Sequence, residues 1–446
     1  MQKIFLFLTM ALTFIACKQE QKTTLLAPIS DEMMSKAVIY EANIRQYSPE
    51  GTFEAFTKDI LKLKEMGVDI IWLMPIHEIG VKNRKGGLGS YYSIKDYRSI
   101  NPEFGTLDDF KKLIKTAHEN GIYVILDWVA NHTAWDHAWV TNHPDFYTKD
   151  ANGNMIAPFD WTDVAELDFT NEKLRTAMIA DMNYWVTELN VDGFRCDVAA
   201  EVPTDFWERA STELQKTKPL FMLAEAEKPE LLKKAFHMQY AWEAHHIFNQ
   251  LAQGKKTVAD FDAYMTKMDS VLEKDDILMN FISNHDENSW NGTVKERMGE
   301  ASELLLALSY TVPGMPMIYN GEEYDLNKRL RFFEKDTIIK EKGKFYEVYK
   351  QLNTLKKKTK ALDTGKNSAT YTRIQTNDQL NILAFSRDKE SEKLVFIGNF
   401  SAQEKEVLMD VEGSFSNYMN SNNEDLSKTT PMKLQAWEYK ILVNNK

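Results

Sequence analysis

Short apolar runs alternate with longer stretches of helical spacing over residues 37–360. The runs read AVIYEANIR, VDIIWLMPI, IYVILDWV, VDGFRCDVA, PLFMLAEA, DILMNFISNHD and MPMIYNGEE. Between the first two, apolar residues recur at a helical interval and stop before Gly67, as seen for Phe53, Phe56, Ile60, Leu63 and Met66. Continuous apolar runs are typical of parallel strands that are buried on both faces. The repeated strand–helix order therefore predicts an α/β fold, and eight such units would close a (β/α)₈ barrel.

Two regions depart from this rhythm. Residues 132–168, after the third predicted strand, are rich in Asp, Asn, Pro and Trp and show no clear helix, which predicts a small insertion. From residue 361 onwards apolar and polar positions alternate, as in ATYTRIQ, NILAFSR, KLVFIGNF, KEVLMDV and WEYKILV. This alternation is the pattern of strands with one buried face. Residues 361–446 are therefore predicted to form a C-terminal antiparallel β-sandwich.

Residues 1–17, MQKIFLFLTMALTFIAC, combine one Lys with an apolar run too short to span a bilayer. The small Ala16 before Cys17 resembles a bacterial lipoprotein signal, in which the cysteine is lipidated and becomes the mature amino terminus. A plain secretory signal is the alternative. We expect export across the inner membrane and lipid attachment through Cys17 to the outer membrane, on its periplasmic or its cell-surface face. Residues 18–36 would then be a polar tether.

Composition narrows the classes of function. The chain holds 54 Lys and Arg against 66 Asp and Glu, a net charge of −12, which argues against a nucleic-acid partner. With two cysteines, Cys17 and Cys196, no disulfide framework stabilises the fold. A lipidated Cys17 would leave Cys196 as a single thiol that must be buried. The 10 Trp, 18 Tyr and 24 Phe fit either a large core or a groove whose rings bind sugars.

Charged residues end four of the apolar runs. In a parallel barrel the carboxyl ends of the strands carry the catalytic groups, and these positions hold Asp127, Arg195 with Asp197, Glu225, and His285 with Asp286. Each acid alone could be a helix cap or part of a surface ion pair, but acids that converge by one rule indicate a site. Paired carboxylates, without a GxSxG motif, a cysteine nucleophile or a Gly-rich phosphate loop, indicate glycosidic chemistry.

Glycosidic cleavage needs one ionised carboxylate and one protonated acid on either side of the reacting sugar carbon. Arg195 lies two residues before Asp197, on the same face of the strand, and would keep that acid ionised by charge pairing. Glu225 ends a mostly apolar strand, a setting that favours the protonated form of a general acid.

The segments DWVANH, GFRCDVA, LAEA and FISNHD resemble, in this order, the four motifs of the α-amylase family of glycoside hydrolases, family thirteen. The segments GVDIIWLMPI, SYYSIKDY with INPEFGTLDDFKKLI, and GMPMIYNGEE resemble its second strand, its third loop and helix, and its last strand. The resemblance covers residues 37–323. It implies a retaining mechanism on a (β/α)₈ barrel with a C-terminal β domain.

The resemblance also implies roles for single residues. Asp197 matches the catalytic nucleophile, Glu225 the general acid/base, and Asp286 the third catalytic acid, which holds sugar hydroxyls. For a retaining enzyme, the carboxyl groups of Asp197 and Glu225 should lie about 5–5.5 Å apart. The implied substrate-binding residues are Tyr92, which stacks under the reacting sugar, Asp127, His132, Arg195 and His285.

The chain departs from the family pattern after the nucleophile. Typical α-amylases carry Lys-His where this chain has Ala200 and Glu201, which is closer to the neopullulanase and cyclomaltodextrinase branch. Because that histidine often helps to ligate calcium, the resemblance leaves a structural Ca²⁺ open. Its candidate ligands are Asn131 and Glu166, fewer side-chain oxygens than Ca²⁺ prefers. The alternative is that Asn131 is a hydrogen-bonding clip between barrel and insertion.

The sequence therefore predicts a hydrolase that cleaves α-1,4 bonds of starch-like glucans or maltodextrins by double displacement. Its partners would be an α-glucan and, through Cys17, a lipid bilayer; no nucleic acid and no organic cofactor is expected. Cyclomaltodextrinase or neopullulanase, α-glucosidase and transglycosylase specificities are alternatives, since these relatives share the catalytic acids. Alternatives from other classes are a catalytically silent glucan-binding protein on the same scaffold and a periplasmic solute-binding protein. The intact acids oppose the former and the barrel motifs the latter.

Overall fold

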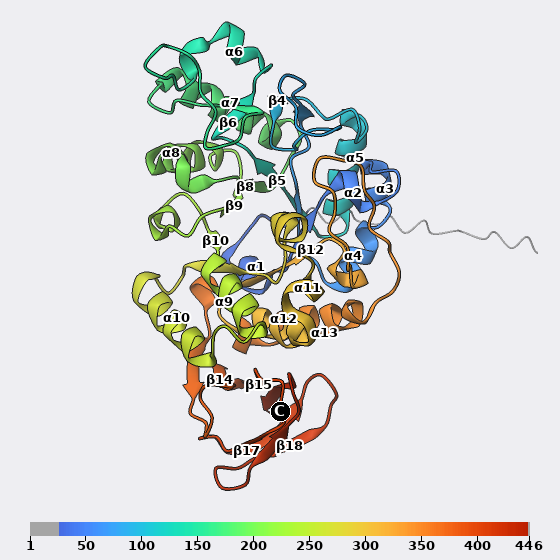
Figure 1. Ribbon diagram of the computed structural model, residues 1–446, viewed down its shortest axis with the longest axis vertical. Coiled ribbons are helices and arrows are strands. Elements are labelled where there is room, and N and C mark those ends of the chain that lie inside the picture. Colours follow the sequence, from blue (N-terminus) through green and yellow to red (C-terminus); the bar gives the residue numbers. More distant parts are fainter. Residues whose placement is uncertain (1–25, 445–446) are drawn as a thin grey trace, which may run out of the picture.

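The computed structural model describes residues 26–444 and contains a closed barrel of parallel strands (Figure 1). The strands follow one another around the barrel in chain order, and the last pairs with the first. They are β1 (Ile39–Ala42), β2 (Ile70–Leu73), β5 (Tyr123–Trp128), β8 (Gly193–Cys196), β9 (Phe221–Ala224), β10 (Met238–Tyr240), β11 (Ile277–Asn280) and β12 (Met315–Tyr319). The predicted (β/α)₈ fold class is confirmed. Strand β10 is absent from the predicted strands, because it has three residues with a polar Gln239 at its centre.

Amphipathic helices surround the barrel. In α5 (Leu107–Glu119), Thr106 and Asp109 form a reciprocal capping box, and the apolar residues Phe110, Leu113, Ile114 and Ala117 are buried. The helix before β2 ends at Gly67, whose left-handed φ of 103° is a conformation that glycine adopts without strain. The main outer helices are α4 (Ile60–Met66), α5 (Leu107–Glu119), α7 (Glu172–Thr187), α8 (Thr204–Leu214), α9 (Trp242–Ala252), α10 (Val258–Val271), α12 (Ser302–Thr311) and α13 (Lys344–Lys358).

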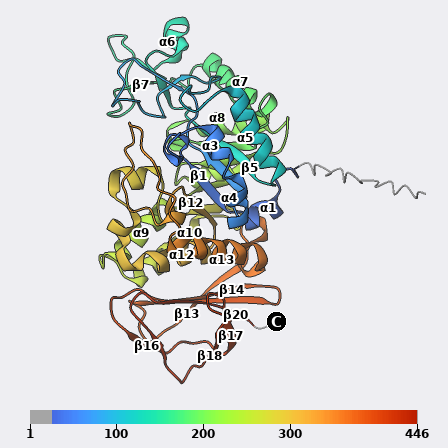
Figure 2. The same cartoon turned by 90° about the vertical axis from the view of Figure 1, so that its right-hand side faces the viewer.

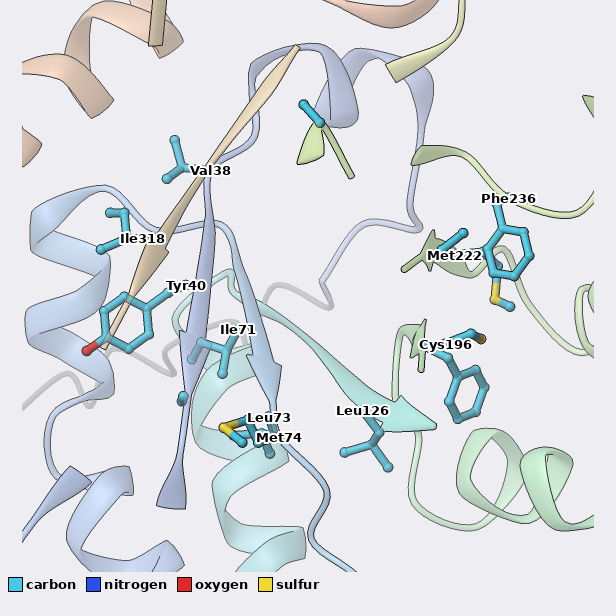
Figure 3. Packing of buried hydrophobic residues seen from close by; sticks show 14 of the residues in the cluster. Val38, Tyr40, Ile71, Leu73, Met74, Leu126, Cys196, Met222, Phe236 and Ile318 are labelled. Carbon is cyan, nitrogen blue, oxygen red and sulfur yellow. The ribbon is translucent and has the colours of Figure 1, made fainter. Parts of the chain in front are cut away.

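Alternate residues of each barrel strand face opposite ways and build two cores. Inward residues such as Ile39, Trp72 and Ile125 form a core inside the barrel. Outward residues meet the helices in a larger core, of which Figure 3 shows a part. Cys196 belongs to this outer core and is fully buried, as expected for a single thiol. The same alternation turns its neighbour Arg195 towards the barrel interior.

The insertion after β5 is closed at its base by two short antiparallel strands, β6 (His132–Ala134) and β7 (Val164–Glu166). Between them lie α6 (Ala138–Asn142) and a turn of 3₁₀-helix. The sequence shows no clear helix in this region, and α6 corrects that interpretation. This helix has five residues and no buried side chain, so it leaves no apolar periodicity to detect.

The C-terminal part forms antiparallel sheets, as predicted. One sheet has the strand order β13 (Thr370–Ile374), β14 (Ile382–Lys389), β15 (Glu392–Asn399), β20 (Tyr439–Asn444), β17 (Gly413–Asn417) and β18 (Asn423–Leu426). The pair β16 (Lys405–Val407) and β19 (Met432–Leu434) closes a small core against it. The larger sheet lies beside α12 and α13 (Figure 2). There the buried Arg387 donates hydrogen bonds to the backbone oxygens of Thr311 and Asp363, and so joins sheet and barrel.

The amino-terminal segment folds against the barrel from residue 26 onwards. Helix α1 (Asp31–Lys36) begins at Ser30, whose side chain accepts from the backbone N–H of Met33. Ile29 and Met34 pack into the core inside the barrel and cover its amino-terminal end. The described part of the region predicted as a tether is therefore a folded plug. Cys17 and residues 18–25 lie outside the described residues, within which no helix is long and apolar enough to cross a membrane.

Candidate active site

The carboxyl ends of β5, β8 and β9 bring the predicted acids together. Asp127 and Arg195 are register partners on β5 and β8. Asp197 directly follows β8, and Glu225 directly follows β9. Strands β8 and β9 come close at Gly193, where a Cβ atom would lie 1.8 Å from the backbone oxygen of Phe221. The glycine of the GFRCD segment thus permits the strand contact that brings Glu225 beside Arg195.

The buried Arg195 guanidinium joins three carboxyl groups. Its Nη1 lies 2.8 Å from Asp127 Oδ1 and 3.0 Å from Asp197 Oδ1, and its Nη2 lies 2.9 Å from Glu225 Oε2. The remaining Nε donates to the hydroxyl of Tyr240 at 3.1 Å. One cation therefore positions acids from three strands in a single arrangement.

Asp127 and Asp197 both have pKa values above those of free aspartates. Burial, together with the charge of Glu225, raises the pKa of Asp197 well above its usual range, while Arg195 lowers it. Burial likewise raises the pKa of Asp127 to about 6 against the opposing effect of Arg195. Arg195 thus acts on Asp197 in the direction expected from the sequence, but burial and the neighbouring charge of Glu225 outweigh it.

A series of hydrogen bonds links Asp127 through Tyr92 and His285 to Glu41. Oδ2 of Asp127 accepts from the hydroxyl of Tyr92 at 3.1 Å, and that hydroxyl lies 2.8 Å from Nε2 of His285. Nδ1 of His285 lies 2.5 Å from Oε1 of Glu41 on β1. Burial opposes the charge on His285, but Asp286 and Glu41 raise its pKa to about 9, so the ring is protonated at neutral pH. Both ring nitrogens are then donors, to Glu41 and to Tyr92.

Glu41 is a site residue that the sequence analysis does not identify. It lies within the first apolar strand and not at its end, so the rule applied to strand ends passes over it. A fully buried acid inside an apolar run is a detectable signal, because such a group needs a charged partner. Its partner here, His285, lies 244 residues further along the sequence.

A cavity of about 470 Å³ opens above these groups. Asp286 stands at its mouth with 38% of its side chain exposed, and its Oδ2 lies 3.3 Å from Nε2 of His285. His132 lines the opposite wall, where burial lowers its pKa to about 4 and keeps the ring neutral. Asp127 and Arg195 lie behind the cavity and do not line it. Of the predicted residues, those that do line it are Tyr92, His132, Asp197, Glu225, His285 and Asp286.

Aromatic rings form the rim of this cavity. Phe332 stacks on Tyr92 with ring centres 6.3 Å apart, and Trp290, which is 52% exposed, continues this wall at 5.2 Å from Phe332. Trp161 of the insertion stands on the other side, with its ring centre 5.5 Å from that of His132. Trp290 and Phe332 do not appear among the sequence-predicted residues. Trp290 lies in a single helical turn (Glu287–Asn291) after β11, and Phe332 lies in the loop after β12, and neither segment carries a periodic pattern.

The two calcium candidates lie at the base of the insertion. The side-chain nitrogen of Asn131 lies 3.3 Å from Nδ1 of His132, and its backbone oxygen accepts from Leu167. Glu166 Oε1 accepts from the hydroxyl of Thr148 at 3.4 Å. Within residues 26–444, no group of three or more His, Cys, Asp and Glu side chains could hold a metal ion. One amide and one carboxylate fit Ca²⁺ poorly, since the ion prefers six to eight oxygens.

A parallel barrel whose carboxyl end gathers paired acids around one arginine is the architecture of a glycoside hydrolase. The chain belongs to the alpha-amylase family, because residues 31–343 match the family's alpha amylase catalytic domain. It is therefore an enzyme of the alpha-amylase type, as the four ordered motifs indicate. This match covers the barrel strands, the insertion and all the predicted catalytic and substrate-binding residues.

Similar proteins include the alpha-amylase MalA of Haloarcula japonica, which is 26% identical over 302 residues, or 65% of this chain. The chain spans 44% of the length of that relative. A noncanonic maltogenic alpha-amylase, AmyB of Thermotoga neapolitana, is 31% identical with a TM-score of 0.85, and the match covers 92% of this chain and 99% of AmyB. An alpha-amylase from Lactobacillus plantarum is also 31% identical with a TM-score of 0.85, over 93% of this chain and all of that protein.

Proposed function

We propose that this protein is a retaining hydrolase that cleaves α-1,4 bonds of starch-like glucans or maltodextrins by double displacement. One observation carries the proposal. Asp197 and Glu225 are bound to the two terminal nitrogens of Arg195 and line the same cavity, beside Asp286. Two acids on neighbouring nitrogens of one guanidinium must lie close together, which supports the short separation expected of retaining enzymes.

In the first step Asp197 attacks the anomeric carbon and forms a covalent glycosyl ester, while Glu225 gives its proton to the leaving oxygen. In the second step Glu225 takes a proton from water, which attacks the same carbon and releases Asp197. The cycle requires that Glu225 carries the proton before the first step and that Asp197 attacks as the carboxylate. The backbone N–H of Val198 donates to Glu225 Oε2 at 2.7 Å and orients that acid.

The other groups of the cavity bind and orient the sugar in this scheme. Asp286 at the mouth accepts hydrogen bonds from sugar hydroxyls, with the positive charge of His285 beside it. The ring of Tyr92 offers a flat apolar face to the sugar, and neutral His132 can both donate and accept. Arg195 and Asp127 position the acids from behind the cavity.

The decisive experiment measures hydrolysis of maltotriose and soluble starch by Asp197→Asn and Glu225→Gln variants. Each substitution keeps the size of the side chain, so we expect an unchanged melting transition and a rate reduced at least about 10³-fold. The configuration of the first product, observed by NMR, tests retention. Undiminished hydrolysis by either variant, or a product of inverted configuration, would overturn the proposed mechanism.

Maltogenic action is the alternative specificity that a specific observation favours. The protein is 31% identical to AmyB over nearly its whole described length, and AmyB is a noncanonic maltogenic alpha-amylase. Ala200 and Glu201, which stand where typical α-amylases carry Lys-His, also favour a specificity of the neopullulanase and cyclomaltodextrinase branch. Sizing the products from starch, pullulan, cyclodextrin and maltotriose separates these specificities. Mixed chain lengths from starch support the proposal, whereas maltose from cyclodextrin supports the cyclomaltodextrinase branch, and glucose alone an α-glucosidase.

Any Ca²⁺ bound by this chain would be held by Asn131 and Glu166, with backbone carbonyls and waters completing its shell. Chelation tests this directly. A melting temperature that is unchanged after treatment with EDTA identifies Asn131 as the clip between barrel and insertion. A fall that added Ca²⁺ reverses, and that Glu166→Gln abolishes, identifies the ion.

A further inference from the structure

A second large concavity lies between the barrel and the C-terminal sheet. It is bounded by α11 (Val294–Met298), the beginnings of α12 and α13, and the turns next to β17 and β20, and its volume is about 830 Å³. Pockets of this size hold ligands as large as several sugar rings. We call it the interdomain groove. None of its lining residues lines the active-site cavity.

Aromatic side chains form one wall of the interdomain groove. Phe345 comes from α13, and Trp437 and Tyr439 come from the turn before β20 and from that strand. All three are only partly buried. Trp437 has a left-handed φ of 59°, a conformation that is unfavourable for a residue other than glycine. The fold thus maintains a strained turn that places its largest side chain in the groove.

Polar groups without protein partners line the same groove. The side-chain oxygens of Asn327, Asn417 and Asn420 accept hydrogen bonds from Thr293, Met419 and Asn422. These bonds fix the orientation of the amides, and within residues 26–444 their side-chain nitrogens donate to no protein group. The indole nitrogen of Trp437 likewise has no protein acceptor in that part of the chain.

An unpartnered carboxyl oxygen lies at the base of the groove. Oε2 of Glu322 accepts from the backbone N–H of Tyr319 and from the hydroxyl of Tyr349, each at 2.8 Å. Its Oε1 is buried without a hydrogen-bond partner, and the residue is 5% exposed. Buried polar atoms without partners are rare in folded proteins, and this one belongs to a residue that lines the groove.

The charges of the groove favour a neutral ligand over an anionic one. Its acids are Glu300, Glu303, Glu322, Asp325 and Glu438, and its cations are Lys295 and Lys344. Lys344 is paired with Glu303, Glu438 is paired with Lys440, and Asp325 accepts from the backbone N–H groups of Lys344 and Phe345. An excess of carboxylates repels phosphates and nucleic acids but accepts hydrogen bonds from hydroxyls. Flat rings, amide donors and carboxylate acceptors together match the apolar faces and the hydroxyl edges of sugars.

The groove lies close to the active site along the chain. Asn327 lines the groove, and Phe332 lines the active-site cavity. Five residues separate them, so the two positions are at most about 18 Å apart. We propose that the interdomain groove is a second binding site for an α-glucan chain, distinct from the active site, that holds polymeric substrate beside it. This inference rests on the proposed function, since it assumes that the substrate is an α-glucan.

The test separates binding from hydrolysis. In a Glu225→Gln background, which removes cleavage, migration through native gels containing soluble starch measures glucan binding. We expect Trp437→Ala to weaken starch binding about tenfold, the effect of losing one well-packed aromatic contact, and Asn420→Ala to weaken it by a smaller factor. Leu380→Ala, which removes an exposed apolar side chain elsewhere on the C-terminal domain, serves as the matched control and should bind like the parent.

Catalysis supplies the second readout. With Glu225 restored, Trp437→Ala should keep the parent kcat/KM for maltotriose, which fits within the active-site cavity, and lose several-fold in kcat/KM for soluble starch. Unchanged maltotriose hydrolysis also shows that the variant folds. If Trp437→Ala and Asn420→Ala both bind starch like the parent, the groove is not a glucan site, and the proposed hydrolase function stands. If the parent cleaves no α-glucan at all, the proposed function itself fails.

Discussion

His285 is held between two acids that determine its charge. Burial alone would favour the neutral ring, but Asp286 and Glu41 raise its pKa to about 9. Because the folded-state pKa is above the unfolded value, the charged ring stabilises the fold fully below about pH 6.5. That contribution is lost as pH rises through the folded-state value. The protonated ring also fixes Tyr92, since its Nε2 is the donor to the tyrosine hydroxyl.

Removing the buried acid should shift the pH profile. In Glu41→Gln the ring loses one of the two negative charges that hold its proton, so the pKa of His285 falls. We expect the alkaline limb of kcat/KM for maltotriose to move to lower pH by about one unit, while the acidic limb stays in place. The exposed Glu32→Gln variant, with the same change of charge on the surface, is the control. An alkaline limb at the parent position in Glu41→Gln would show that His285 is not the group that titrates there.

At the scale of elements, the turn that joins β8 to the following 3₁₀-helix couples the two catalytic strands. Val198 has φ of 36° and ψ of 47°, a left-handed conformation that is unfavourable for a β-branched residue. The turn is held by bonds to the ends of both neighbouring strands. Asp197 N–H donates to Trp128 O at 2.9 Å, and Ala199 N–H donates to Glu225 O at 3.1 Å. These bonds maintain the strain and place the Val198 N–H against the side chain of Glu225.

Relieving this strain should change stability and catalysis in opposite directions. Val198→Gly removes a conformational cost of roughly 1–2 kcal/mol but adds unfolded-state entropy of about 0.4–1 kcal/mol. We therefore expect the free energy of unfolding, measured with urea, to stay level or rise by up to about 1.6 kcal/mol, and kcat to fall as the turn becomes less rigid. Val198→Ala retains the left-handed strain and is the matched control. Its free energy of unfolding should not rise. A Val198→Gly variant that loses more than about 1 kcal/mol would contradict the presence of strain.

At the scale of the whole molecule, the parts predicted from the sequence are those that obey a periodic rule. Buried strands show as apolar runs, and their ends locate Asp127, Asp197 and Glu225 without knowledge of the fold. Strand β10 is missed because three residues with a central glutamine carry too little pattern. The rim residue Trp290 is missed because its position depends on loop paths, and these follow from tertiary packing.

The sequence predicts a tether where the amino-terminal plug lies, because residues 26–36 are too few to show a periodic pattern of apolar positions. The apolar side chains of Ile29 and Met34 are buried only because they pack against the open end of the barrel, which the sequence of this segment does not reveal. Glu41 is missed for a similar reason, since its charge is explained by a histidine that lies 244 residues away in the sequence. Long-range partners of this kind are set by the closure of the barrel and not by local sequence.

The position of the plug determines how a lipid anchor would orient the enzyme. Residues 26–36 cover the amino-terminal end of the barrel, and the active-site cavity opens at the opposite, carboxyl end. Nine residues link Cys17 to Leu26, a span of at most about 32 Å. We propose that a lipid on Cys17 holds the amino-terminal end towards the outer membrane, so that the cavity faces away from the bilayer and is open to polymeric glucans.

This arrangement predicts that the lipid anchor determines whether the protein is bound to membranes and does not change its rate of hydrolysis. We expect the natural chain, produced in a bacterial host, to incorporate labelled palmitate and to sediment with membranes, and Cys17→Ser to do neither. Because the amino-terminal plug lies at the end of the barrel opposite the cavity, the solubilised parent and a truncated protein that begins at Lys18 should hydrolyse maltotriose with the same kcat/KM. The buried Cys196 is the internal control, since Cys196→Ser should leave labelling unchanged. Label on the Cys17→Ser protein would show that another residue carries the lipid, and an unlabelled parent in the soluble fraction would identify a plain secretory signal.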